Sequence, residues 1–213
     1  CAQGWISPKA MRNGIIITVL FACLIGSSLL FYAGWELIIV GLLCVLFAFL
    51  YTTGPYPLSY NGWGDILVIV FFGFVPVGGT YYVQALTWTT DTTIASLICG
   101  LLIDTLLVVN NYRDREADAD SGKRTVIVRF GEKFGSYLYL MLGMTASLLC
   151  FWFLFEGHLY AALLPLLYLI PHFLTWKRMV RIHSGKKLNS ILGETSRNML
   201  LMGILLSIGF FLN

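Results

Sequence analysis

Charged residues are scarce in this sequence: Asp, Glu, Lys and Arg together occupy 12% of its 213 positions. A soluble domain carries about 25%, so an ordinary soluble protein is excluded. In their place, 58% of the residues are hydrophobic and the mean hydropathy is +0.79. Several apolar runs approach the roughly 20 residues that a membrane-crossing helix needs. The composition therefore predicts an all-α fold, a polytopic membrane helix bundle.

Paired cysteines and long basic runs are also missing. The five cysteines are scattered, with no CxxC pair and no Cys/His cluster, so neither a disulfide framework nor a zinc site is expected. The net charge is only +3, and the basic residues lie at the ends of apolar runs. A membrane surface explains them better than a nucleic acid does. No basic segment followed by a cleavage site precedes the first run, so a signal peptide is not expected.

Seven apolar runs are interpreted as membrane spans. The second is short for a full crossing and is expected to tilt little or to include flanking residues. Ser7 before Pro8 predicts a helix start ahead of the first span. The predicted spans are 14–32, 37–51, 66–86, 94–109, 137–155, 159–176 and 199–212.

The distribution of basic residues tests this topology. If the spans alternate, all 14 Lys and Arg residues fall on one side. The opposite connections carry Glu36, Asp91, Glu156 and His158 and no basic residue. Because Lys and Arg accumulate on the cytoplasmic side of a membrane, the segment after the fourth span is predicted to be cytoplasmic.

Charged residues are densest directly after that span: segment 113–133 holds six Lys/Arg and five Asp/Glu residues. If the helix continues past residue 109, Asn110, Asp114 and Asp118 share one face at i, i+4 and i+8. Carboxylates one turn apart repel unless a cation lies between them, and Mg²⁺ binds one or two carboxylates together with waters and phosphate oxygens. Lys123 and Arg124 follow and can bind phosphate. A diphosphate bound with Mg²⁺ is predicted, although DxxxD alone also fits a solvated, self-neutralising loop.

The wider pattern is more specific. Asn-Asn-Tyr-Arg-Asp-x-x-x-Asp-x-x-x-Gly-Lys-Arg-Thr at 110–125, with Val-Arg-Phe-Gly at 128–131, resembles the second Asp-rich motif of the UbiA superfamily of intramembrane prenyltransferases. The block 51–60, followed by Gly-Trp-Gly-Asp at 62–65 and Phe-Phe-Gly at 71–73, is similar to that family's preceding cytoplasmic loop and helix. Within the superfamily, the branch that acts on 1,4-dihydroxy-2-naphthoate in menaquinone biosynthesis is the most similar.

The resemblance implies an Mg²⁺-dependent enzyme. Family members hold a polyprenyl diphosphate through Mg²⁺ on two Asp-rich motifs, ionise the allylic carbon–oxygen bond and alkylate an aromatic ring. In the naphthoate branch the attacked carbon loses CO₂, which gives demethylmenaquinol. The implied partners are a polyprenyl diphosphate, 1,4-dihydroxy-2-naphthoate and the lipid bilayer, with no nucleic acid. The implied location is the bacterial inner (cytoplasmic) membrane.

Carried over residue by residue, the resemblance makes Asp114 and Asp118 metal-binding and catalytic, with Asn110 as a supporting metal ligand. Tyr51 is expected at the reaction centre. The expected substrate-binding residues are Asn110, Asn111, Arg113, Lys123, Arg124 and Tyr60. The alternatives are anchoring at the membrane surface for the basic residues and an interfacial aromatic belt for the tyrosines.

Three polar residues are left without a role carried over from the family. Asp65 completes Gly-x-Gly-Asp and is interpreted either as a helix cap or as a functional residue. Asp104 lies inside a span, where a carboxylate costs roughly 2.5 to 3.5 kcal/mol, and is expected to be buried and hydrogen-bonded. His172 is expected to be a hydrogen-bonded residue of helix packing.

Other classes of membrane protein fit less well. A retinal protein needs an intramembrane Lys for its Schiff base, and every Lys here lies near a predicted cytoplasmic end. A transporter is expected to show internal repeats or paired broken helices, and none is clear. A CDP-alcohol phosphotransferase has a denser Asp-x-x-Asp-Gly signature, which is missing. A prenyltransferase with another aromatic acceptor stays open.

The first residues raise a further expectation. The resembled family has nine helices and two Asp-rich motifs, whereas this sequence shows seven spans and one such motif and begins at Cys1. A single transmembrane prenyltransferase domain, 1–213, that is incomplete at its N-terminus is therefore expected, with two helices and an Asn/Asp-rich loop upstream. A lipoprotein-type Cys1 is the competing explanation, but it would invert the charge pattern.

Overall fold

The structure, a computed structural model, describes residues 4–212, so Cys1 lies outside the described residues. Those residues form helices and no strand. Six helical segments are long and apolar enough to cross a membrane, and the 17-residue apolar helix Glu36–Thr52 is shorter. The six are Pro8–Ala33, Gly64–Ala85, Thr90–Asp120, Val126–Phe155, Leu159–Ile182 and Lys186–Phe211. The all-α membrane bundle predicted from composition is confirmed.

Several segments consist of more than one helical element. The first half contains α1 (Pro8–Ser27), α2 (Leu30–Ala33), α3 (Glu36–Thr52), the 3₁₀ turn η1 (Leu58–Asn61), α4 (Gly64–Val68), the π-helix η2 (Ile69–Gly78), α5 (Gly79–Ala85) and α6 (Thr90–Asp120). The second half contains α7 (Val126–Leu149), α8 (Trp152–Phe155), α9 (Leu159–Leu163), η3 (Leu164–Tyr168), α10 (Leu169–Ile182), η4 (Lys186–Leu188) and α11 (Asn189–Phe211).

Each predicted span has a helical counterpart, but several helices extend well beyond the apolar run. The Thr90–Asp120 helix continues past residue 109, α7 begins at Val126 instead of 137, and the last helical segment begins at Lys186 instead of 199. An apolar run marks only the part of a helix that faces lipid. The ends of the helix are determined by capping residues. The Thr125 hydroxyl accepts the Val128 N–H and starts α7, as the Ser7 hydroxyl does for α1.

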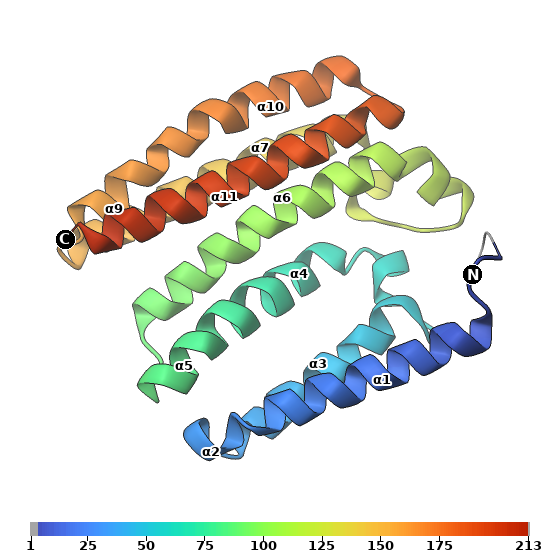
Figure 1. Cartoon of the computed structure of the whole chain (residues 1–213). Coiled ribbons are helices and arrows are strands. Elements are labelled where there is room, and N and C mark those ends of the chain that lie inside the picture. The colour runs from blue at the N-terminus through green and yellow to red at the C-terminus, as the bar shows by residue number, and fades with distance from the viewer. Residues whose placement is uncertain (1–3, 213) are drawn as a thin grey trace.

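Helix α6 lies at the centre of the chain's packing, with η2 on one side and α7 on another (Figure 1). Two glycines allow α6 and η2 to approach through their backbones. A Cβ on Gly100 would lie 2.9 Å from the Ile69 carbonyl oxygen, and one on Gly73 would lie 2.5 Å from that of Ser96. Small residues at such crossings are typical of membrane helix pairs. This contact fixes η2 against the apolar part of α6.

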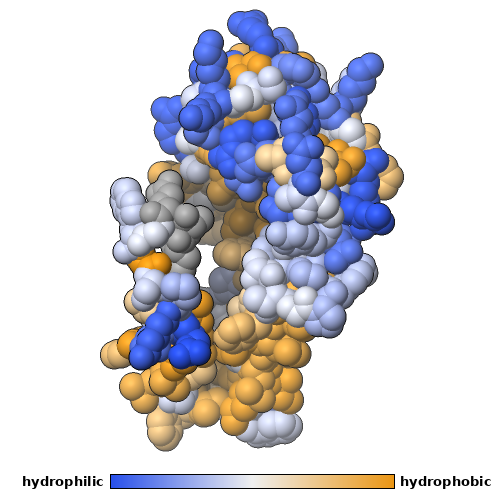
Figure 2. Space-filling view, turned by 90° about the vertical axis from the view of Figure 1, so that its right-hand side faces the viewer, coloured by the Kyte–Doolittle hydropathy of each residue, from blue (hydrophilic) through white to orange (hydrophobic). Residues whose placement is uncertain are grey.

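Three features meet at one end of the bundle: the start of α1, the α6–α7 connection and the α10–α11 connection (Figure 1). Figure 2 looks onto that end and shows hydrophilic side chains gathered on it, with a hollow between two parts of the molecule. The sides of the bundle expose many large apolar residues, and none of the 20 residues of α1 is buried. The chain is therefore a multi-pass membrane protein whose polar end carries the candidate site.

Candidate active site

A polar cavity of about 350 Å³ lies where the C-terminal end of α6 meets the α3–α4 connection. Four elements contribute to its wall: the end of α3, η1, the start of α4, and α6 with the turn that follows it. The lining residues are Tyr51, Thr52, Ser59, Tyr60, Gly62, Gly64, Asp65, Leu107, Asn110, Asn111, Asp114, Asp118, Lys123 and Thr125. Residues distant in the sequence thus form one compartment.

Hydrogen bonds to backbone carbonyl oxygens hold the α3–α4 connection against the α6–α7 turn and the start of α7. The Arg124 N–H donates to the Tyr60 carbonyl oxygen at 2.7 Å, and Arg129 Nη2 donates to the Asn61 carbonyl oxygen at 2.7 Å. Gly62 has φ +81°, and a Cβ there would lie 2.9 Å from the Arg124 carbonyl oxygen. Only glycine combines this backbone conformation with so close an approach. The Gly-Trp-Gly-Asp block therefore begins with a residue needed for docking the two loops.

Both acids of the DxxxD motif are paired with bases. Arg113 contacts Asp114 at 2.5 Å, and Lys123 Nζ contacts Asp118 Oδ1 at 2.7 Å. The hydrogen bond to Asp118 raises the pKa of Lys123 above its usual value, so its ammonium stays charged throughout the physiological range. Lys123 Nζ also lies 5.4 Å from the centroid of the Tyr60 ring. The cavity thus contains an acidic face with its own cations beside it.

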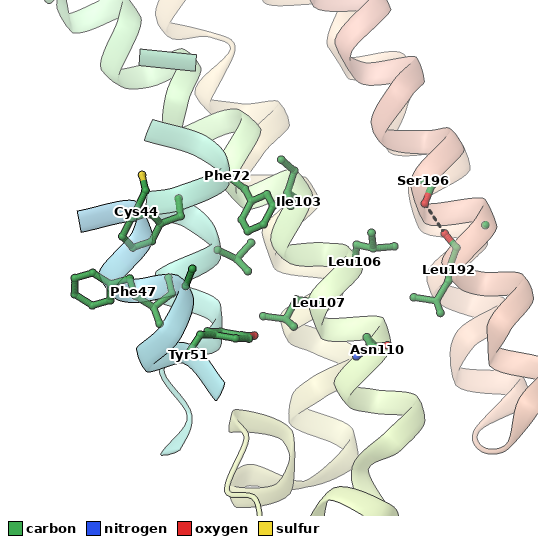
Figure 3. Close-up of a pocket in the computed structure, with 15 residues that line it drawn as sticks. Cys44, Phe47, Tyr51, Phe72, Ile103, Leu106, Leu107, Asn110, Leu192 and Ser196 are labelled. Atoms are coloured by element: carbon green, nitrogen blue, oxygen red, sulfur yellow. Dashed lines mark hydrogen bonds between the residues drawn. The ribbon is translucent and has the colours of Figure 1, made fainter. Parts of the chain in front are cut away.

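A second cavity, of about 840 Å³, adjoins the first and is mainly apolar. The two share Tyr51, Leu107 and Asn110. In Figure 3, side chains of α3 and of α4–η2 lie on one side, α6 lies behind, and Leu192 and Ser196 of α11 lie opposite. Three phenylalanines contribute to the wall: Phe47, Phe71 and Phe72. A polar compartment therefore passes directly into a long apolar one.

The structure brings together most of the residues singled out from the sequence. The predicted residues that line the polar cavity are Tyr51, Tyr60, Asn110, Asn111, Asp114, Asp118 and Lys123. Arg113 lies beside it, where its guanidinium contacts Asp114, Asn110 and Asn189. Arg124 is different: its side chain is exposed and is not part of the wall. Its backbone N–H serves the loop contact instead.

The prediction of a buried, hydrogen-bonded side chain was made for both His172 and Asp104, and the structure agrees with it fully only for His172. His172 is fully buried and hydrogen-bonded on both ring nitrogens, as expected. Asp104 is also buried, with 1% exposed, but the expectation that it is hydrogen-bonded is wrong, because neither carboxyl oxygen has a partner among residues 4–212.

The donor set determines which metal could be held. Within residues 4–212 there is no group of three or more His, Cys, Asp or Glu residues placed to bind an ion. Asp114 and Asp118 are nevertheless hard oxygen donors on successive turns of one helix. Such a pair suits a divalent cation that takes its other ligands from phosphate and water. The residues present therefore fit a metal held jointly by protein and substrate.

The chain is also similar in sequence to known proteins. The model of the UbiA prenyltransferase family matches residues 1–209. The 1,4-dihydroxy-2-naphthoate octaprenyltransferase of Escherichia coli (strain K12) is 33% identical over 227 residues, covering 99% of this chain and 71% of that protein. The enzyme of the same name from Haemophilus influenzae is 33% identical, covering 99% and 70%. That from Mycobacterium tuberculosis is 36% identical, covering 68% and 50%. No solved structure matches.

Proposed function

The chain belongs to the UbiA prenyltransferase family, and from that premise we propose that it transfers a polyprenyl group from polyprenyl diphosphate to 1,4-dihydroxy-2-naphthoate. The attacked carbon loses CO₂, and the product is demethylmenaquinol of menaquinone biosynthesis. One observation carries the proposal: a polar cavity with two carboxylates and a lysine opens into an apolar cavity. A polyprenyl diphosphate has the same division into a charged head and an apolar tail.

The polar cavity accounts for the diphosphate. Family members generally use a divalent metal, and we infer that Asp114 and Asp118 hold Mg²⁺ here, with Asn110 in support. When bound, the metal neutralises charge on the departing diphosphate. Lys123 contributes a cation from the same wall, and Arg113 lies next to it. Charge placed in advance at a leaving group stabilises the transition state without reorganisation.

The apolar cavity accounts for the tail and for protection of the allylic cation. Its walls exclude water, which would otherwise capture the cation. Aromatic faces such as those of Phe71 and Phe72 can stabilise a passing positive charge. Tyr51, Leu107 and Asn110 border both cavities, so the reacting carbon of the prenyl group lies near them. We place Tyr51 at the reaction centre, and Tyr60 and Asn111 on the diphosphate side.

The location follows from the charge pattern. Lys and Arg residues accumulate on the cytoplasmic side, and the connections that carry them meet at the end of the bundle containing the polar cavity. We therefore infer that the site opens to the cytoplasm in a bacterial inner membrane. Both proposed substrates would reach it there, the naphthoate from water and the prenyl tail from lipid.

The test is a direct assay of the protein that carries this chain, in lipid nanodiscs with Mg²⁺. Supplied with a polyprenyl diphosphate and 1,4-dihydroxy-2-naphthoate labelled in its carboxyl group, it should release labelled CO₂ and diphosphate in equal amounts. Transfer to 4-hydroxybenzoate without CO₂ release would retain the family and overturn the acceptor. Metal-dependent binding of prenyl diphosphate without turnover of any acceptor would overturn both the proposed acceptor and the proposed transfer reaction.

A further inference from the structure

Asp65 lines the polar cavity, yet the mechanism above does not use it. The other two carboxylates in the wall each have a cation, Asp114 through Arg113 and Asp118 through Lys123. In the described part of the chain, no Lys or Arg nitrogen lies within 4 Å of Asp65, and its carboxyl contacts its own backbone N–H. A half-buried carboxylate in a ligand cavity is thus left without a partner side chain.

The place of Asp65 in the cavity limits what it can contact. Tyr51 borders both cavities, and its hydroxyl lies 3.5 Å from the position of a Cβ on Gly64, the residue before Asp65. Asp65 therefore lies close to the junction where the diphosphate compartment becomes the prenyl compartment. The carbon that joins prenyl group and diphosphate must lie there.

We propose that Asp65 is a catalytic residue that binds the acceptor's ring hydroxyl next to the attacked carbon and holds its proton during prenyl transfer. This inference rests on the proposed function. It identifies a base that makes the aromatic ring electron-rich enough to attack the allylic carbon. Neither the DxxxD motif nor Lys123 supplies such a base.

The atoms and electrons balance without another reactant. The ring hydroxyl passes its proton to Asp65, and the ring carbon that bears the carboxylate forms a bond to the allylic carbon as the carbon–oxygen bond to diphosphate breaks. The ring is then a ketone with a carboxylate on the adjacent carbon. Loss of CO₂ returns the electron pair to the ring as an enolate, which takes the proton back from Asp65. Diphosphate, CO₂ and the prenylated hydroquinone leave, and Asp65 is again a carboxylate.

Asp65→Asn is the central test, because it retains the shape of the side chain and cannot accept a proton. General base catalysis contributes roughly 10²- to 10⁴-fold, so kcat should fall at least about 100-fold. Binding of an unreactive prenyl thiodiphosphate with Mg²⁺ should stay within about twofold of wild type. Asp120→Asn, an exposed acid on α6 outside the cavity wall, is the matched control and should retain wild-type kcat.

The outcomes separate this inference from the proposed function. If wild type turns over a different acceptor, the acceptor assignment fails, and Asp65→Asn is then tested with that acceptor's own ring hydroxyl. A kcat for Asp65→Asn within about threefold of wild type overturns the catalytic role. An equal loss of thiodiphosphate binding also overturns it, because Asp65 would then serve the diphosphate or the fold.

Discussion

Two groups of buried polar side chains lie in this bundle, and they differ in how completely their hydrogen bonds are satisfied. One lies among the C-terminal helices. The His172 ring accepts from the Tyr168 hydroxyl at 2.9 Å and donates to the Leu140 carbonyl oxygen at 3.2 Å, which leaves neither nitrogen free. A Cβ on Gly143 would lie 2.3 Å from that ring, so α7 has glycine where the histidine packs.

The same group continues toward the polar end. Glu194 is paired with Arg178 at 2.6 Å and accepts from the Thr175 hydroxyl, which in turn accepts from Asn198 Nδ2 at 3.0 Å. By contrast, the group on α4 and α6 contains Asp104, whose carboxyl has no hydrogen-bond partner among residues 4–212, and Asp65, which no Lys or Arg of those residues contacts. A satisfied network fixes helix packing, whereas open groups beside a cavity are available to a ligand. Substitutions in the first should therefore affect stability, and those in the second chemistry.

The substitution with the largest expected effect on this comparison removes Asp118, one of the two acids proposed to hold the metal. Asp118→Ala should lower kcat by roughly 10²- to 10³-fold or more, because much of the charge stabilisation of the leaving diphosphate is lost. Chelation of the metal with EDTA should have the same effect on wild type and be reversed by excess Mg²⁺. Release of diphosphate is the measurement.

The control for that substitution is Glu116→Ala, whose side chain is 82% exposed outside the cavity wall. It should retain activity, and both variants should melt within a few degrees of wild type. An Asp118→Ala protein with full activity would remove the DxxxD motif from the site.

Lys123→Gln should have the next largest effect. The ammonium contacts Asp118 and faces the cavity, and a hydrogen bond to a charged group contributes about 1.5 to 3 kcal/mol. The KM for polyprenyl diphosphate should therefore rise at least about tenfold. Lys123→Arg should recover part of this loss.

The pH dependence of Lys123→Gln follows from the raised pKa of Lys123. The charged form is present below the ordinary pKa of lysine and is lost only as the pH rises past the raised value. The ratio of wild-type to Lys123→Gln KM should thus stay constant from pH 6 to pH 9. A ratio that falls within that range would show that the ammonium is not the group responsible.

Part of the candidate site could be predicted from the sequence. The sequence placed Asn110, Asp114 and Asp118 on one face on the condition that the helix continues past residue 109, and α6 does continue to Asp120. The sequence could not predict the orientation of the Arg124 side chain. That orientation depends on a backbone contact between Arg124 and Tyr60, which lies in a distant loop. The sequence also could not predict that the Asp104 carboxyl lacks a hydrogen-bond partner among residues 4–212. Its burial follows from the apolar run, but its partners depend on which side chains the neighbouring helices present.

In the satisfied group, His172→Ala should act on stability. The substitution leaves the Tyr168 hydroxyl and the Leu140 carbonyl oxygen without their partner, and an unsatisfied buried group costs about 1 to 3 kcal/mol. The melting temperature in detergent should fall by several degrees, while kcat of the folded protein stays within about threefold of wild type. Leu174→Ala on the same helix, exposed on the lipid side, is the control. A large loss of kcat without a loss of stability would place His172 in the chemistry and erase the distinction.

The smallest expected effect lies in the apolar cavity. Gly193 of α11 is part of its wall, and a Cβ there would meet no atom within 4 Å. Gly193→Leu should therefore fold normally and extend into the space proposed for the prenyl tail. The loss of kcat/KM should be about twofold with a short prenyl diphosphate and several-fold larger with a long one, because a longer tail needs more of the cavity. Gly203→Leu makes the same change on the same helix outside the wall, also into open space, and should leave both substrates unaffected. Equal losses with short and long substrates, or equal losses in the two variants, would show that the tail does not occupy this cavity.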